Sequence, residues 1–440
     1  MISFQLVILP GLRKLILIIV LSHICFGLIA QKQKKKRTSR ERSPQQELVY
    51  DNINYLQTIK SVQFYPVDQE NAFPVIELFS DDQLMLAFDD LRGDVRNYYF
   101  SIEHCDANWV PSRLSPLEYA EGYNEDRILE YSTSVNTLQS YAHYRVNFPS
   151  ENVRPKLAGN YLLKVYEDAD KSRLIITRRF YVLAPLMSVS FQLVPSVDVA
   201  KRNKNQKLNV TVNTGGLTVN NPYQDVKILV LQNQRPDIQQ WLTTPQFVNN
   251  SELRYHDNRT LDFGGGNEFR YIDLRSLRLA SERMANIQID STVRVDLIPD
   301  ENYSNASYAS TFDENGHFFI RNQDKNNADT ESDYINVQFT LASNAVTEGA
   351  IYVVGGFNGY QRDETNKLQY DPGQKQWKGT LLLKQGLYDY EYVYVSPSGE
   401  VSTTFSSGDH FETNNTYQVL VYNRRQGTTW DELVGFSEAK

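Results

Sequence analysis

Tyrosine occupies every second position between residues 388 and 394, in the run Tyr-Asp-Tyr-Glu-Tyr-Val-Tyr. Alternate residues of a β-strand point to the same side, so this run places four aromatic rings on one face of one strand. Such a face usually packs against a second sheet; left exposed, it offers a stacking surface for sugars or a partner protein. The run therefore predicts a strand within a layered β-structure.

Short runs of aromatic and β-branched residues recur along the whole chain, separated by turn residues such as Gly93 and Gly159. The composition agrees, because 28 Tyr and 21 Phe stand against 4 Met in 440 residues, and sheets favour aromatic side chains. We predict an all-β protein, a string of about three antiparallel immunoglobulin-like β-sandwich domains. Changes of pattern at Pro185 and in the polar stretch 322–332 predict domains at residues 48–185, 186–330 and 331–440.

The first 30 residues are typical of a secretory signal peptide, because Arg13 and Lys14 precede an apolar run that ends in the small residue Ala30. We expect cleavage near Ala30. A membrane anchor is the alternative, but the run is short for a span and His23 interrupts it.

Residues 31–47 form a basic leader that we expect to be disordered, with a tether to anionic lipid or to an acidic partner as the alternative. The chain as a whole carries a net charge of −8. Since residues 1–30 carry +2 and residues 31–42 carry +6, residues 43–440 carry −16. A basic leader therefore precedes an acidic body.

No spacing typical of a catalytic centre appears, so we predict no enzyme, no catalytic residue, no cofactor and no metal site. His104, Cys105 and Asp106 are metal-ligand types, but neighbours in a strand point to opposite faces and cannot easily share one ion. The only other cysteine lies in the predicted signal peptide. A pI of about 5.4 argues against nucleic-acid binding.

Several motifs, in one order from about residue 48 to 435, resemble the plug protein family of the type IX secretion system of the Bacteroidota. They lie at residues 103–109, 141–144, 157–166, 177–180, 266–270, 313–317, 409–417 and 430–435. The motif residues, to which we assign structural roles, are His104, Asp106, Trp109, Tyr144, Gly159, Asn160, Tyr161, Arg179, His410 and Asn415.

The resemblance implies a non-enzymatic periplasmic protein at the inner face of the outer membrane. Such a protein reversibly closes the periplasmic side of the translocon, and its partner is a large outer-membrane β-barrel. The mature chain would have no membrane span and no small-molecule substrate. We expect the first domain to enter the pore, because its loops at 105–117 and 131–144 are the most distinctive.

A second, local resemblance covers residues 351–390 and is similar to starch- and glycogen-binding (early-set) β-sandwich modules. Its Phe-Asn motif contains Asn358, and Tyr360 stands where those modules carry a stacking Trp. Trp377 is a second candidate for stacking on a sugar, whereas Glu391 replaces a usual Lys. The alternative function is therefore a glycan-binding β-sandwich protein of the periplasm or cell surface, although we interpret the similarity as one of fold.

Overall fold

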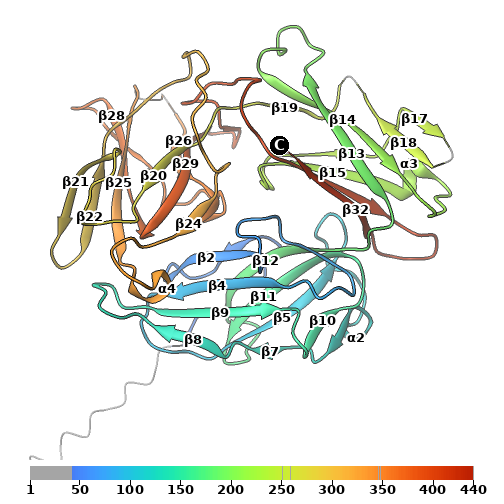
Figure 1. The fold of residues 1–440 in the computed structure, drawn as a ribbon, viewed down its shortest axis with the longest axis horizontal. Helices are drawn as coiled ribbons and strands as arrows, with labels where there is room; N and C mark the ends of the chain where they lie inside the picture. The colour runs from blue at the N-terminus through green and yellow to red at the C-terminus, as the bar shows by residue number, and fades with distance from the viewer. Residues whose placement is uncertain (1–41, 250, 258, 345, 347, 440) are drawn as a thin grey trace, which may run out of the picture. The chain divides into compact units, whose positions relative to one another are not determined.

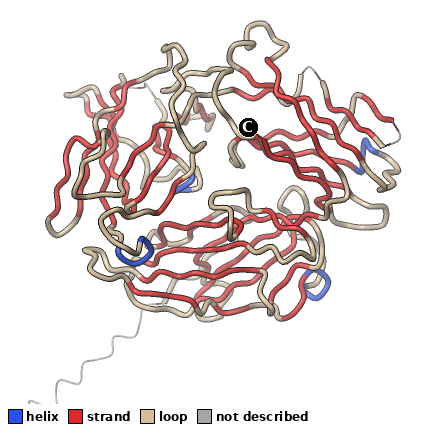
Figure 2. Tube along the Cα trace, in the orientation of Figure 1, coloured by secondary structure: helices blue, strands red, loops and turns tan. Residues whose placement is uncertain are grey.

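The computed structural model describes residues 42–439, except residues 250, 258, 345 and 347. The predicted signal peptide and most of the predicted leader lie outside the described residues. Pro44–Lys440 forms one compact unit. Nearly all of its regular structure is β (Figure 1, Figure 2), which confirms the predicted fold class. Among the described residues, four strand pairs are parallel rather than antiparallel: β3–β12, β12–β32, β22–β25 and β23–β25.

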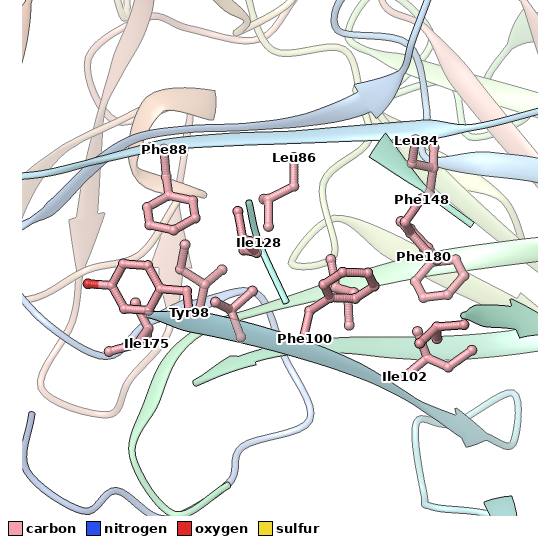
Figure 3. Packing of buried hydrophobic residues seen from close by; sticks show 14 of the residues in the cluster. Leu84, Leu86, Phe88, Tyr98, Phe100, Ile102, Ile128, Phe148, Ile175 and Phe180 are labelled. Atoms are coloured by element: carbon pink, nitrogen blue, oxygen red, sulfur yellow. The ribbon is translucent and has the colours of Figure 1, made fainter. Parts of the chain in front are cut away.

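The first sandwich packs two sheets around a core rich in aromatic rings. Figure 3 shows Leu84, Leu86 and Phe88 of one sheet above Phe100 and Ile102 of the other. One sheet has the order β2 (Ile59–Pro66), β4 (Leu84–Asp90), β9 (Ala142–Phe148), β8 (Glu130–Thr133). The other has the order β12 (Leu174–Leu183), β11 (Gly159–Glu167), β5 (Tyr98–Cys105), β7 (Asp126–Arg127), and β1 (Ile53–Asn54) and β3 (Val75–Glu77) also pair with β12. The short α2 (Pro116–Tyr119) leads into β6 (Ala120–Gly122), which pairs with β10 (Val153–Pro155).

The second sandwich combines strands from two distant parts of the chain. One sheet has the order β13 (Ser188–Pro195), β14 (Asn205–Asn213), β18 (Glu252–Tyr255), β17 (Phe247–Asn249), with β19 (Asp262–Gly264) beside β14. The other has the order β16 (Gln239–Leu242), β15 (Val226–Gln232), β31 (Tyr417–Asn423), β32 (Glu432–Ala439), and α3 (Pro222–Asp225) precedes β15. A parallel contact between β32 and β12, at Leu433 and Leu183, joins this second sheet to the first sandwich.

The third sandwich is built from residues 270–402 and has its own core. One sheet has the order β21 (Met284–Ile289), β22 (Val293–Leu297), β25 (Tyr334–Ala342), β28 (Gln376–Lys384), β27 (Gln369–Asp371), with β23 (Asp300–Glu301) beside β25. In the other, β29 (Gly386–Val395) pairs with β20 (Arg270–Asp273), β24 (Phe318–Ile320), β26 (Ala350–Val354) and β30 (Val401–Ser402). The short helices α4 (Ala328–Glu331) and η1 (Gly356–Asn358) lie in its loops. Tyr388, Tyr390 and Tyr392 of β29 are buried in this core, as the alternating tyrosines predict.

The third sandwich is an insertion in the second, which differs from the predicted boundary at residue 330. The predicted C-terminal domain contains β31 and β32, but the structure pairs β31 with β15 and buries Val419 and Val421 in the core of the second sandwich. The two chain segments that connect the second sandwich to the third lie side by side, because Gly266 N donates to Asp409 Oδ1 at 2.8 Å. A local strand pattern carries no information about such a distant partner, because alternation specifies a face and not a neighbour.

Candidate functional site

Large apolar side chains are exposed along one continuous stretch of the first sandwich, residues 117–131. Leu117, Tyr123 and Leu129 are 74%, 71% and 72% exposed, and Tyr131 of β8 is about half exposed. These four residues are called the apolar rim below. Leu117 lies in α2 and Tyr131 in β8, whereas Tyr123 and Leu129 lie in the loops before and after β7; α2, β7 and β8 are labelled in Figure 1. Exposed apolar side chains mark a protein interaction surface where they gather into one patch.

Carboxylates lie between the apolar residues of this stretch. Glu118 accepts from the backbone N–H of Ser115 at 2.7 Å and thereby caps the first turn of α2, which begins at Pro116. The other acidic residues of the stretch are Glu121, Glu125, Asp126 and Glu130. This stretch of the sequence therefore combines exposed apolar side chains with negative charge, which suits a partner that presents apolar and basic side chains.

A buried charged junction connects the first and third sandwiches. Asp89 of β4 accepts from Lys384 Nζ of β28 at 2.6 Å and from Tyr334 OH of β25 at 2.7 Å, and its other oxygen lies 2.7 Å from His143 Nδ1. Burial alone would raise the pKa of Asp89, but the charge of Lys384 and the contacts of His143 lower it below its usual value. Asp89 therefore stays ionised and holds β28 against β4.

A second junction joins the first sandwich to the second. Asn160 Nδ2 donates to Asp106 O at 3.2 Å, and its Oδ1 accepts from Tyr422 OH of β31 at 2.8 Å. Asp431 accepts from Ala107 N at 3.2 Å and from both Arg424 Nε and Nη2, at 2.9 and 2.8 Å. Asn160, a motif residue, thus links two sandwiches.

The motif around His104 forms a buried strand end followed by a turn. His104 is fully buried and lies edge-on to Tyr161, with ring centroids 4.9 Å apart. Burial lowers the pKa of His104 to about 4, so the ring is neutral at pH 7. Asp106 Oδ1 accepts from the backbone N–H groups of Asn108 and Val110, both at 2.9 Å. Within the described residues, no three His, Cys, Asp or Glu side chains gather as a metal site would require.

The other motif residues also make structural contacts. Arg179 lies over the ring of Trp109, 4.5 Å from its centroid, and also bonds Tyr50 O. In the first sandwich, Tyr144 OH accepts from the backbone N–H of Arg96, Tyr161 OH donates to Leu157 O, and Gly159 has a φ of +142°. In the third sandwich, Asn358 accepts from Gly355 N. Near the second sandwich, His410 N donates to Gly266 O and the side-chain amide of Asn415 donates to Gln206 Oε1.

The two candidate sugar-stacking rings are occupied by other contacts. Trp377 is buried in the third core, and its indole N–H donates to Asn344 O at 3.1 Å. The guanidinium of Arg235 lies 4.1 Å from the ring centroid of Tyr360 and pairs with Glu391. Glu391 therefore helps to hold the guanidinium of Arg235 against one face of the Tyr360 ring.

All three sandwiches line a cleft of about 420 Å³. The first contributes strand β2, the segment around Phe73, and Arg178. The second contributes the loop at Asn233, and the third contributes η1 and the loop that follows it. Sequence reasoning missed this cleft, because its lining comes from loops whose meeting depends on how the sandwiches pack.

Comparison with known proteins relates these features to a family. Residues 59–184 match the sequence profile of the type 9 secretion system plug protein 1st domain. The crystal structure of a hypothetical protein from Parabacteroides merdae is 30% identical to this chain, with a TM-score of 0.86, and the match covers 89% of this chain and 100% of that chain. The chain belongs to the same family as that protein, and its first sandwich carries the first domain of type 9 secretion system plug proteins.

The domain that matches the plug profile is the first sandwich, which carries the apolar rim. The match connects the chain to type 9 secretion and to an interaction with a component of that system. No curated protein matches the chain. The partial N-terminal region of an enterococcal surface protein aligns over 90% of this chain and 97% of that chain at 7% identity, with a TM-score of only 0.18. Within the described residues, no helix is long and apolar enough to cross a membrane.

Residues 339–378 of the chain match a Kelch motif. A Kelch blade is one four-stranded sheet of a propeller. Here β25 and β28 pair with each other, whereas β26 pairs with β29 in the other sheet of the third sandwich. The strands in this range therefore form part of a sandwich and not a propeller blade.

Proposed function

We propose that the mature chain is a non-enzymatic periplasmic plug that reversibly closes the periplasmic side of the type 9 translocon, with a large outer-membrane β-barrel as its partner. The observation that carries the proposal is the match of residues 59–184 to the plug domain. The buried hydrogen bonds and ion pairs between the sandwiches support it, since a protein that closes a pore must keep its shape under load. Closing a pore requires no chemistry, and the buried His104 and Cys105 supply none.

The apolar rim is the surface that we assign to the barrel. It lies on the matched domain, and the carboxylates between its apolar residues suit a reversible contact rather than an obligate one. The charge of −16 on residues 43–440 contributes mainly to the rate of encounter with a basic barrel rim. Raising the salt concentration should therefore slow association more than it speeds dissociation.

The test is conductance of the purified translocon barrel in a planar bilayer. Adding the mature chain to the periplasmic side should reduce the current, and the variant Leu117→Asp/Leu129→Asp should block at least tenfold more weakly. Phe312→Asp is the matched control, because Phe312 is 78% exposed on the third sandwich. An unchanged current at saturating wild-type protein would refute the plug. Full blocking by the double variant would refute the assignment of the rim alone.

A further inference from the structure

The cleft between the three sandwiches is basic, although the body of the protein is acidic. The charged residues that line it are Lys60, Arg178, Arg179, Arg362 and a single carboxylate, Asp363. Residues 43–440 as a whole carry −16. A positive cleft in a negative body attracts anionic groups to one place on the molecule.

Among the described residues, two of these cations, Lys60 and Arg178, form no ion pair with a carboxylate. Arg179 pairs with Asp51 at 3.2 Å and Arg362 pairs with Asp237 at 3.0 Å. In contrast, Arg178 bonds only neutral groups, Ile53 O, Thr177 O and Asn54 Oδ1.

Burial lowers the pKa of Arg178 to about 10, against the opposing charge of Asp51. Burial also lowers the pKa of Lys60, and the charge of Asp363 offsets part of the effect. Both groups remain cationic at pH 7. They are half-buried charges that an incoming anion would stabilise.

The cleft also contains a free strand edge. Within the described residues, strand β2 is an edge strand of its sheet and pairs only with β4, and its residues from Ile59 to Tyr65 line the cleft. The register of β2 against β4 shifts between Lys60 and Gln63, where Ser61 has a φ of +50°. Such a bulge turns backbone groups away from the regular ladder. An edge strand with unpaired N–H and C=O groups is the usual template for adding an extended peptide.

We propose that this cleft binds an extended, acidic peptide segment of another protein, which adds to β2 as a strand and places its carboxylates against Lys60 and Arg178. The site is separate from the apolar rim, so it goes beyond pore closure. A sugar is a poorer candidate, because Arg235 already lies against the aromatic ring of Tyr360 in the cleft.

The test is fluorescence anisotropy of the mature chain with a labelled, end-capped octapeptide of alternating valine and glutamate. Saturable binding is expected, and Lys60→Gln and Arg178→Gln should each weaken it at least fivefold. Lys378→Gln is the control, because Lys378 pairs with Asp371 on the third sandwich and does not line the cleft. Since Arg178 also bonds the backbone, circular dichroism checks its fold, and Lys60→Gln provides the second variant.

Three further probes decide the nature of the ligand. The same octapeptide with lysine in place of glutamate should not bind. A version with N-methyl groups at alternate positions, which cannot complete a β-ladder, should bind at least tenfold more weakly. No saturable binding up to millimolar peptide, or equal binding of the lysine peptide, would overturn the proposal. Equal binding of the N-methylated peptide, or equally effective competition by inorganic phosphate, would replace strand addition with a simple anion pocket.

Discussion

Asp89 and Lys384 lie 295 positions apart in the chain, and their carboxylate and ammonium groups meet at 2.6 Å with side chains that are each 1% exposed. The pair belongs to two different sandwiches, β4 of the first and β28 of the third. Tyr334 and His143 complete the hydrogen bonding of the carboxylate. A buried pair satisfied in this way fixes one packing of the sandwiches, because any other arrangement leaves a charge without a partner.

Lys384→Met should destabilise the protein by about 3–5 kcal/mol, because it leaves Asp89 buried without its counter-ion. Urea unfolding at pH 7 measures the change. Lys378→Met is the matched control on the same strand, since Lys378 pairs with Asp371 at the surface at 3.0 Å and such pairs contribute about 0–1 kcal/mol. The double variant Asp89→Asn/Lys384→Met should recover part of the loss. Equal destabilisation by the two lysine variants would show that the buried pair contributes no more to stability than the surface pair.

The sequence predicts much of the local structure of this protein and little of its tertiary arrangement. Alternation identifies β29, because Tyr388, Tyr390 and Tyr392 must share a buried face. The capped turn at Pro116 is likewise local. Lys384 follows three leucines in an apolar strand, which signals that a partner is needed but cannot say that Asp89 provides it. The motif residues contact structural partners such as Tyr422, and the cleft exists only once three sandwiches meet.

The buried carboxyl group of Asp389 should make the stability of the protein depend on pH near neutrality. Burial raises the pKa of Asp389 to about 7 and the charge of Asp313 adds to the rise, although the backbone N–H groups of Glu314 and Gly316 donate to the carboxylate and oppose it. A carboxyl whose folded pKa exceeds its unfolded value of 3.8 stabilises the fold below that value, and this contribution disappears as the pH rises through about 7. As the pH rises from 5 to 8, the free energy of unfolding of Asp389→Asn should therefore increase by roughly 1–3 kcal/mol relative to that of the wild type. Parallel stability profiles for the two proteins would contradict this.

Gly159→Ala should destabilise the first sandwich by about 1–3 kcal/mol. Gly159 has a φ of +142°, and an added Cβ would lie 2.8 Å from His104 Nε2 and 3.0 Å from Asp431 O. Gly427→Ala separates backbone strain from the steric clash of the added Cβ, because Gly427 has a φ of +87° and open space around it. Its thermal midpoint should fall much less. A similar fall in both variants would assign the effect to backbone strain alone.

The insertion of the third sandwich makes two deletions behave differently. A chain that ends at residue 414 lacks β31 and β32, so the second sandwich loses the strand that pairs with β15 and the buried residues Val419 and Val421. We expect that chain to expose its second core and bind hydrophobic dyes.

Replacing residues 268–407 with a short Gly-Ser linker should instead leave a folded protein, although it removes as much as a whole sandwich. The two ends of the insertion are already adjacent, because His410 N donates to Gly266 O at 2.8 Å, so closing the chain costs little entropy. Asp89 then faces water and needs no counter-ion. Circular dichroism and a cooperative thermal transition check the result. If the chain ending at residue 414 folds and the linker chain does not, β31 and β32 are not integral to the second sandwich.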